Sequence, residues 1–195
     1  MTKAKVIEDL RKHGIEQKVT VKDKNGKDIQ VYKPFFKSWL GDGYAYYING
    51  AALYRDQNPL PDFEYGIEEI KWAKDHFENN RLKRIDIDKA VLKDCIKATR
   101  RGTTHPTEAF KINYKGGVIV INPWFLQDML EYTKNYAIYI DEDWNGNETV
   151  YKKPVYGFSE DFTTIQCITL PINVDYDVFK CCIENPNMKI ESEVA

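Results

Sequence analysis

The sequence contains one run of cations whose spacing suits a single kind of chemistry. They stand at Lys89, Lys93, Lys97 and Arg100. Intervals of three and four residues place side chains on one face of an α-helix. A row of ammonium and guanidinium groups can hold phosphate oxygens, and such binding weakens as the salt concentration rises. Because phosphate contacts read no bases, the row would not discriminate between nucleotide sequences.

The same pattern also describes the solvent-facing side of an ordinary amphipathic helix. Leu92, Cys95 and Ile96 lie on the opposite face and would pack inward. Two features favour a binding role. Asp94 is the only acid inside the segment, so i,i+4 pairs with glutamate are absent. Further cations flank both ends of the segment, at Lys83, Arg84 and Arg101.

A second constellation resembles a calcium-binding loop. Asp141, Asp143 and the dipeptide Asn145-Gly146 have the spacing at which such a loop begins. Its twelfth position should be a bidentate glutamate, but Lys152 stands there. The flanking segments alternate like strands, so we expect a hairpin turn and no metal.

The sequence contains no motif that would place catalytic groups together. The three histidines, His13, His76 and His105, each stand without an acid or cysteine at ligand spacing. No glycine-rich phosphate loop or nucleophile elbow follows a predicted strand. We therefore expect no catalytic residues, no cofactor and no enzymatic activity. A deep pocket that gathers histidine, cysteine and carboxylates would reverse this expectation.

The cysteines and the apolar segments indicate a cellular setting. Cys95, Cys167, Cys181 and Cys182 form no C-x-x-C pair, which favours a reducing compartment. No apolar run approaches the roughly 20 residues that cross a membrane. The N-terminal segment lacks the apolar core of a signal peptide. We expect a cytoplasmic protein with no membrane contact.

Periodicity predicts an α+β chain of about ten strands and four helices. The 195 residues, 43% of them hydrophobic, suit one domain or two small ones. Helices are expected over residues 2–13, 68–79, 88–102 and 123–134. Strands are expected over 19–33 as a hairpin around Asn25-Gly26, and over 43–55, 81–87, 109–121, 136–141, 149–156 and 162–174.

Charge divides unevenly along the chain. Residues 1–110 carry 21 Lys and Arg against 17 Asp and Glu, a net charge of +4. Residues 111–195 carry 7 against 13, a net charge of −6. A net-acidic protein can bind nucleic acid when its cations gather on one face. The uneven division is equally compatible with chance.

Several segments, in this order, are similar to one known family. They are 44–55 with Asn-Gly-Ala-Ala-Leu, 61–64 with Pro-Asp-Phe-Glu, the strand and helix 81–98, the segment Val-Ile-Val-Ile-Asn-Pro-Trp-Phe-Leu-Gln-Asp-Met-Leu at 118–130, and 151–174 ending in Thr-Leu-Pro-Ile-Asn-Val. Together they resemble the bacterial DNA polymerase sliding clamp, the beta subunit or processivity factor, over roughly residues 44–174.

This resemblance implies a DNA-clamp-like (processivity) fold: antiparallel sheets with a few helices packed on one face, the helices turning Lys and Arg toward DNA. It divides the chain into N-terminal elements (1–80) packed on the rest, a clamp-like β-α-β unit (81–174) and a C-terminal tail (175–195). The chain is too short for a three-domain clamp, so a closed ring would require several copies, as a homo-oligomer.

Two departures from the family pattern bear on function. The second predicted helix, 123–134, has Gln127, Asp128 and Glu131 on its polar side and lacks a basic face. The resemblance places a partner-peptide groove at Leu170, Pro171 and Ile172, where a polymerase or another replication protein would dock. Asn173 stands where the family has arginine, which places this docking in question.

Two functional hypotheses remain open from sequence. In the first, the chain is a DNA-associated accessory factor, from a phage or mobile element, that contacts phosphates of double-stranded DNA through Lys89, Lys93, Lys97, Arg100 and Arg101. In the second, it is a protein-interaction module that kept the clamp-like fold and does not bind DNA. The acidic second helix and the missing arginine favour the second hypothesis.

Overall fold

The computed structural model describes residues 1–67, 77–78, 82–102, 108–114, 117–141, 154–171 and 182–184. Within them the chain is α+β, as predicted, with mostly antiparallel strands. The helices are α1 (Lys3–Lys12), α3 (Lys89–Ala98) and α4 (Pro123–Thr133). The strands are β1 (Glu16–Lys22), β2 (Asp28–Pro34), β3 (Lys37–Gly41), β4 (Tyr44–Ile48), β5 (Ala52–Asp56), β6 (Gly66–Ile67), β7 (Leu82–Asp86), β8 (Ala109–Tyr114), β9 (Gly117–Ile121), β10 (Ala137–Asp141), β11 (Val155–Phe158), β12 (Ile165–Thr169) and β13 (Cys182–Glu184).

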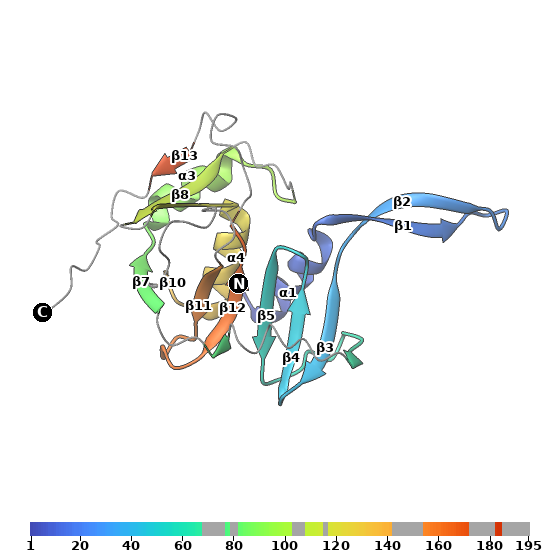
Figure 1. Cartoon of the computed structure of the whole chain (residues 1–195), viewed down its shortest axis with the longest axis horizontal. Helices are drawn as coiled ribbons and strands as arrows, with labels where there is room; N and C mark the ends of the chain where they lie inside the picture. Colours follow the sequence, from blue (N-terminus) through green and yellow to red (C-terminus); the bar gives the residue numbers. More distant parts are fainter. Residues whose placement is uncertain are drawn as a thin grey trace, which may run out of the picture.

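An eight-stranded sheet organises the body of the molecule (Figure 1). Its order is β6-β3-β4-β5-β12-β11-β10-β7, and every neighbouring pair except β3 and β6 is antiparallel. The pairing of β5 with β12 joins the strands of the first 80 residues to those of the later segment. A smaller sheet, β13-β8-β9, and a separate β1-β2 ribbon complete the strands.

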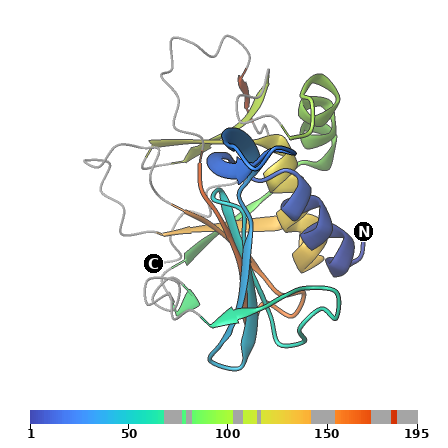
Figure 2. The same ribbon diagram turned by 90° about the vertical axis from the view of Figure 1, so that its right-hand side faces the viewer.

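The three helices lie on one side of the large sheet (Figure 2). α4 contacts β11 and β12, and α1 and α3 both contact α4. Alternation along the strands then buries both faces of the sheet. In β4, for example, Tyr47 points into the cluster beneath the helices and Tyr46 into a second cluster on the other face. Each helix is therefore held by burial of its apolar side.

Local signals in the sequence account for the element starts. Thr2 caps α1, and Val6, Ile7 and Leu10 are its buried face. Asn122 caps α4 and is followed by proline at the first helical position. The Asn25-Gly26 hairpin is confirmed as β1 and β2. The predicted helix over 68–79 falls largely outside the described residues, as does the calcium-like loop after residue 141.

The basic helix ends earlier than predicted. We expected Gly102 to stop it, but the C-cap of α3 is Thr99. Thr99 leaves the helix because other elements hold it: its Oγ1 donates to the Glu108 carbonyl at 2.7 Å, and its carbonyl accepts from Trp124 Nε1 at 2.7 Å. The prediction for Gly102 is wrong. Arg100 consequently follows the helix and does not lie within it.

The start predicted for the strand over 162–174 is also wrong. β12 spans only Ile165–Thr169. Phe162 has a positive φ of 59°, and its N–H donates to the Ser159 carbonyl, which makes a turn ahead of the strand. No helix in the described part of the chain is long and apolar enough to cross a bilayer.

Candidate nucleic-acid interface

Helix α3 displays the basic residues because its other side is fixed in the core. The Asp88 carboxylate caps the helix by accepting from the Ala90 and Val91 N–H groups at 2.7 and 3.2 Å. Leu92 and Cys95 are buried. Burial of these two residues sets the rotation of α3 about its axis, so the residues on the side turned away from them, Lys93 and Lys97 among them, face solvent.

The exposed cations of α3 make few interactions that occupy their charge. Lys93 and Arg100 are exposed, and no ion pair joins either to another described residue. Lys97 lies 2.8 Å from Asp94, but both side chains are 65% exposed, and such a pair is weak and screened by salt. Its hydrogen bond lowers the pKa of Asp94. Lys97 therefore remains accessible to a polyanion.

Lys89 occupies a different environment. Its ammonium lies 3.3 Å from the centroid of the Tyr136 ring, a cation–π contact across to the segment that follows α4. The residue is nevertheless exposed. A phosphate approaching α3 would meet this charge held in place by the ring.

Arg101 points inward, away from the other cations. Its Nη2 reaches both carboxylate oxygens of Asp128, at 2.6 and 2.9 Å, and lies 3.2 Å from Asp9 Oδ2. The guanidinium also lies 4.7 Å from the Trp124 ring. We call Arg101, Asp9 and Asp128 the buried ion cluster. It ties α1, α4 and the segment after α3 together.

Burial alters the titration of this cluster. Desolvation raises the pKa of Asp128 to about 7, although Arg101 acts in the opposite direction. Burial and then the Arg101 charge lower the pKa of His13, which lies at the end of α1. The cluster is therefore sensitive to pH near neutrality.

The sequence reading of α4 needs a correction at this point. Asp128 was assigned to a polar outer side, but it is buried and paired with Arg101. Glu131, from the same predicted side, pairs with the N-terminal amine. Both carboxylates are thus paired with cations. Asp128 lies between Leu126 and Met129, two core residues, and that position was the available signal.

The predicted peptide groove is described only in part. Leu170 is 47% exposed, and its N–H donates to the Ala51 carbonyl at 2.8 Å. Pro171 is buried. Ile172 lies outside the described residues.

Two hollows bear on catalytic or ligand-binding alternatives. One, of about 580 Å³, is lined by Arg11, Trp39 and Phe63 among others, and the second, of about 370 Å³, by Lys3, Arg55 and Asp161 among others. Neither lining contains histidine or cysteine. Among the described residues, no group of three or more His, Cys, Asp or Glu side chains could hold a metal ion.

Comparisons with known proteins do not add to this description. The chain matches no family model, no curated protein and no solved structure. The site must therefore be interpreted from its own geometry.

Proposed function

We propose that the protein is a non-enzymatic, DNA-associated accessory factor whose clamp-like domain contacts duplex phosphates through α3. The observation that carries the proposal is the exposed row on α3 and just beyond it. Lys93, Lys97 and Arg100 face solvent while Leu92 and Cys95 anchor the helix. Contacts of this kind hold a backbone without reading its sequence.

The order of elements supports a likeness to the sliding clamps. Strand β7 leads into α3, strands β8 and β9 follow, and α4 leads into β10. The helices share one side of the sheet, which is where a clamp presents its cations. We propose that several copies of this chain assemble around the duplex.

The buried ion cluster restricts the proposal to four cations. Arg101 was one of the predicted phosphate contacts, but Asp9 and Asp128 already occupy its guanidinium. We therefore leave it out. The proposed contacts are Lys89, Lys93, Lys97 and Arg100, and the three lysines span about 12 Å of α3 at the helical rise of about 1.5 Å per residue.

The test is binding to a random-sequence duplex by fluorescence anisotropy at about 50 and about 200 mM salt. Four contacts predict that the logarithm of the affinity falls with the logarithm of salt at a slope of about −3 to −4. Lys93→Glu with Lys97→Glu should abolish binding without unfolding the protein.

A matched control makes the same change in charge elsewhere. Lys5→Glu with Lys134→Glu alters two exposed lysines near the N-terminus that already lie beside carboxylates. This control should bind DNA like the wild type. Equal loss in both variants, or no loss in either, would remove α3 from the proposed interface.

One observation favours a second function, a protein-interaction module. Leu170 is an exposed leucine at the end of β12, next to buried Pro171, where the resemblance places a peptide groove. A replication-protein peptide would bury this side chain. Leu170→Ser should then weaken binding of a clamp-binding peptide several-fold with the DNA affinity unchanged. Unchanged peptide binding, or none by the wild type, would contradict this function.

A further inference from the structure

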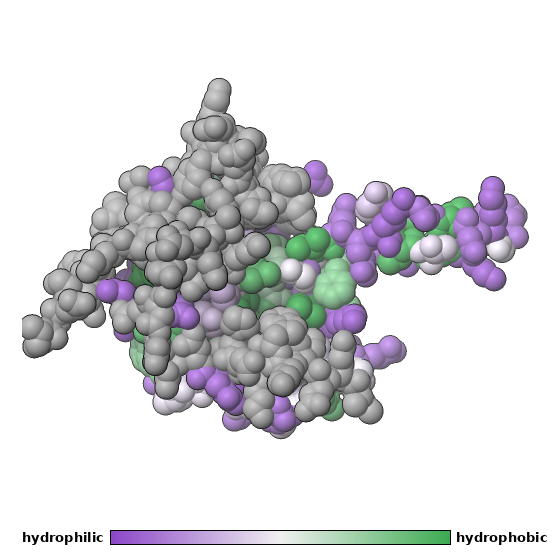
Figure 3. Space-filling view, in the orientation of Figure 1, coloured by the Kyte–Doolittle hydropathy of each residue, from purple (hydrophilic) through white to green (hydrophobic). Residues whose placement is uncertain are grey.

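The β1-β2 ribbon projects from the body of the molecule as an arm. Figure 1 shows it extending beyond the sheet, and Figure 3 shows its surface standing clear of the rest. Its strands pair in register over seven residues each, from Glu16 opposite Pro34 to Lys22 opposite Asp28. At about 3.3 Å per residue the arm is about 23 Å long. An isolated two-stranded ribbon is only marginally stable in water, so a projecting one favours a binding partner.

The register divides the arm into two faces. Residues directly opposite each other in an antiparallel pair share a face. One face is apolar and is formed by Val19, Val21, Ile29 and Val31. Three of these four are half-buried, and only Ile29 is exposed, at 39%. The valine side chains therefore partly cover one another, and these apolar contacts stabilise the pairing of β1 with β2.

The other face is polar and wet. Lys18 stands opposite Tyr32, Thr20 opposite Gln30, and Lys22 opposite Asp28. All six side chains are exposed, and Tyr32 reaches 67% exposure. Hydroxyl, amide and ammonium groups thus line one side of the ribbon, and no other described element packs on them.

The charge on the arm is positive in a protein of net charge −2. Residues 16–34 carry five lysines and three acids. One acid is tied up by the turn, because Asp23 Oδ1 accepts from the Asn25 and Lys27 N–H groups at 2.8 and 2.9 Å. In the described part of the chain none of the five lysines forms an ion pair. They are Lys18, Lys22, Lys24, Lys27 and Lys33.

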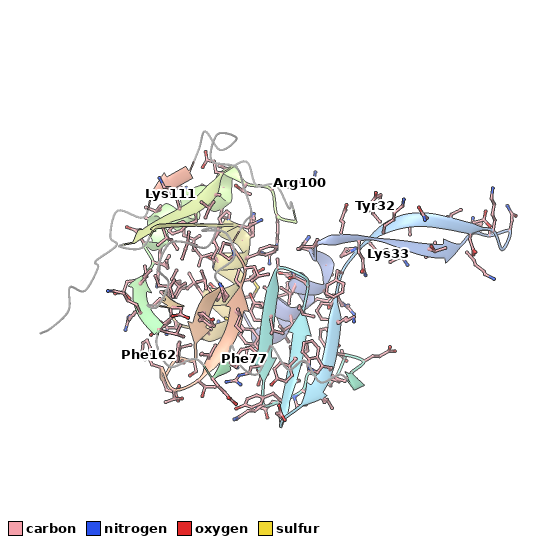
Figure 4. The ribbon with its side chains drawn as sticks, in the orientation of Figure 1. Tyr32, Lys33, Phe77, Arg100, Lys111 and Phe162 are labelled. Carbon is pink, nitrogen blue, oxygen red and sulfur yellow. The ribbon has the colours of Figure 1, made fainter. Side chains whose placement is uncertain are left out.

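The root of the arm lies beside the end of α3. Arg101 contacts Asp9 of α1 at 3.2 Å, and a Cβ atom added to Gly102 would lie 2.6 Å from His13 Nδ1. β1 begins three residues after His13. In Figure 4 the Arg100 side chain lies on the same upper side of the molecule as Tyr32 and Lys33 of the arm. The segment that follows α3 therefore lies beside the root of the arm.

We propose that the β1-β2 arm is a second contact for duplex DNA, laid into a groove next to the backbone held by α3. This inference rests on the proposed function. A B-form major groove is about 12 Å wide and admits a two-stranded ribbon. Lys18 near the root and Lys24 at the tip are separated by about 20 Å of strand, enough for the arm to cross the groove and meet phosphates on both sides.

The test uses arm and helix variants side by side in the full chain. Lys18→Gln with Lys22→Gln removes two exposed charges from the polar face and leaves the valines intact. With the same duplex at about 100 mM salt we expect affinity about tenfold lower and a salt slope reduced by about 2. Lys5→Gln with Lys134→Gln is the matched control, since both lie toward the N-terminal end of α1, away from the arm.

The outcomes separate the two proposals. Loss of DNA affinity in the arm variant alone would support the arm as a contact and overturn the contact through α3. Loss of affinity in the Lys93→Glu, Lys97→Glu variant alone would overturn the contact through the arm and support the proposed function. No binding by the wild type overturns both. The arm could instead bind a second copy of the chain, and light scattering in the same buffers tests this alternative. An oligomer that dissociates in Ile29→Ser, a change to the apolar face, while the DNA affinity stays unchanged, would overturn the proposal that the arm binds DNA.

Discussion

Arg100 and Arg101 are neighbours in sequence and belong to two different regions of the molecule. Arg100 is exposed at the end of the basic row, whereas Arg101 is only 20% exposed and lies against Asp128 and Asp9. Removing a buried cation costs much more stability than removing an exposed one, because the carboxylate left behind cannot be solvated. The difference shows that the positive charge of this segment is divided between an internal ion cluster and the exposed row that we propose as a DNA contact.

The largest expected effect is on the buried ion cluster. At about pH 8, Arg101→Met leaves Asp128 buried without the cation that stabilises its ionised form and should lower the free energy of unfolding by about 3–5 kcal/mol. Urea denaturation followed by circular dichroism measures it. Arg84→Met is the control, because that arginine and its partner Asp86 are both largely exposed, and it should cost less than about 1 kcal/mol. Equal losses would erase the distinction between the two regions.

The pH dependence of stability sharpens the same comparison. Burial raises the pKa of Asp128 to about 7 from an ordinary value near 3.8. The folded state therefore binds this proton more tightly than the unfolded state. Its contribution to stability is fully present below about pH 4 and is lost as pH rises through about 7.

The corresponding variant replaces the titrating carboxyl group with an amide. Asp128→Asn should flatten the fall in the urea midpoint between about pH 4 and about pH 8. The exposed Lys93→Gln variant should keep the wild-type pH profile. A wild-type midpoint that rises with pH over this interval, and loses the rise in Asp128→Asn, would mean that Arg101 controls the carboxyl more strongly than burial does.

An intermediate effect is expected at the start of α3. Asp88 caps the helix through two N–H groups, so Asp88→Ala should cost about 1 kcal/mol of stability. DNA affinity under strongly native conditions should barely change, because the row itself is intact. Thermal unfolding and anisotropy on one sample separate the two quantities. A large loss of affinity at unchanged stability would place Asp88 in the interface.

The smallest effect on stability is expected in the exposed row. Lys93 forms no ion pair with a described residue, so Lys93→Ala should alter the free energy of unfolding by less than about 0.5 kcal/mol. Its DNA affinity should nevertheless fall several-fold at low salt. A destabilisation comparable to that of Arg101→Met would show that Lys93 makes a structural contact.

Local features of the fold were predictable because they depend on neighbouring residues. The Asp88 cap, the buried Leu92 and Cys95, and the Asn25-Gly26 turn all follow from patterns within one turn or one strand pair. The end of α3 was not predictable in this way. Thr99 leaves the helix because Trp124 and Glu108, from other elements, hold it.

The same distinction between local and distant contacts applies to the candidate site. The exposure of Lys93 and Lys97 followed from helical periodicity. The role of Arg101 did not, because Asp9 and Asp128 come from distant parts of the chain and only the packing of α1 against α4 brings them together. Alternation likewise predicted the hairpin of the arm, but whether anything covers its faces depends on the rest of the fold.

The most direct test of the central claim is binding of the wild-type chain to a random-sequence duplex at about 50 and about 200 mM salt, with the mass in solution measured in the same buffers. We predict binding by a multimer that weakens steeply with salt. A slope of about −3 to −4 would indicate that α3 alone makes contact, and a steeper one that the arm takes part. No binding at the lower salt concentration would contradict a role on DNA.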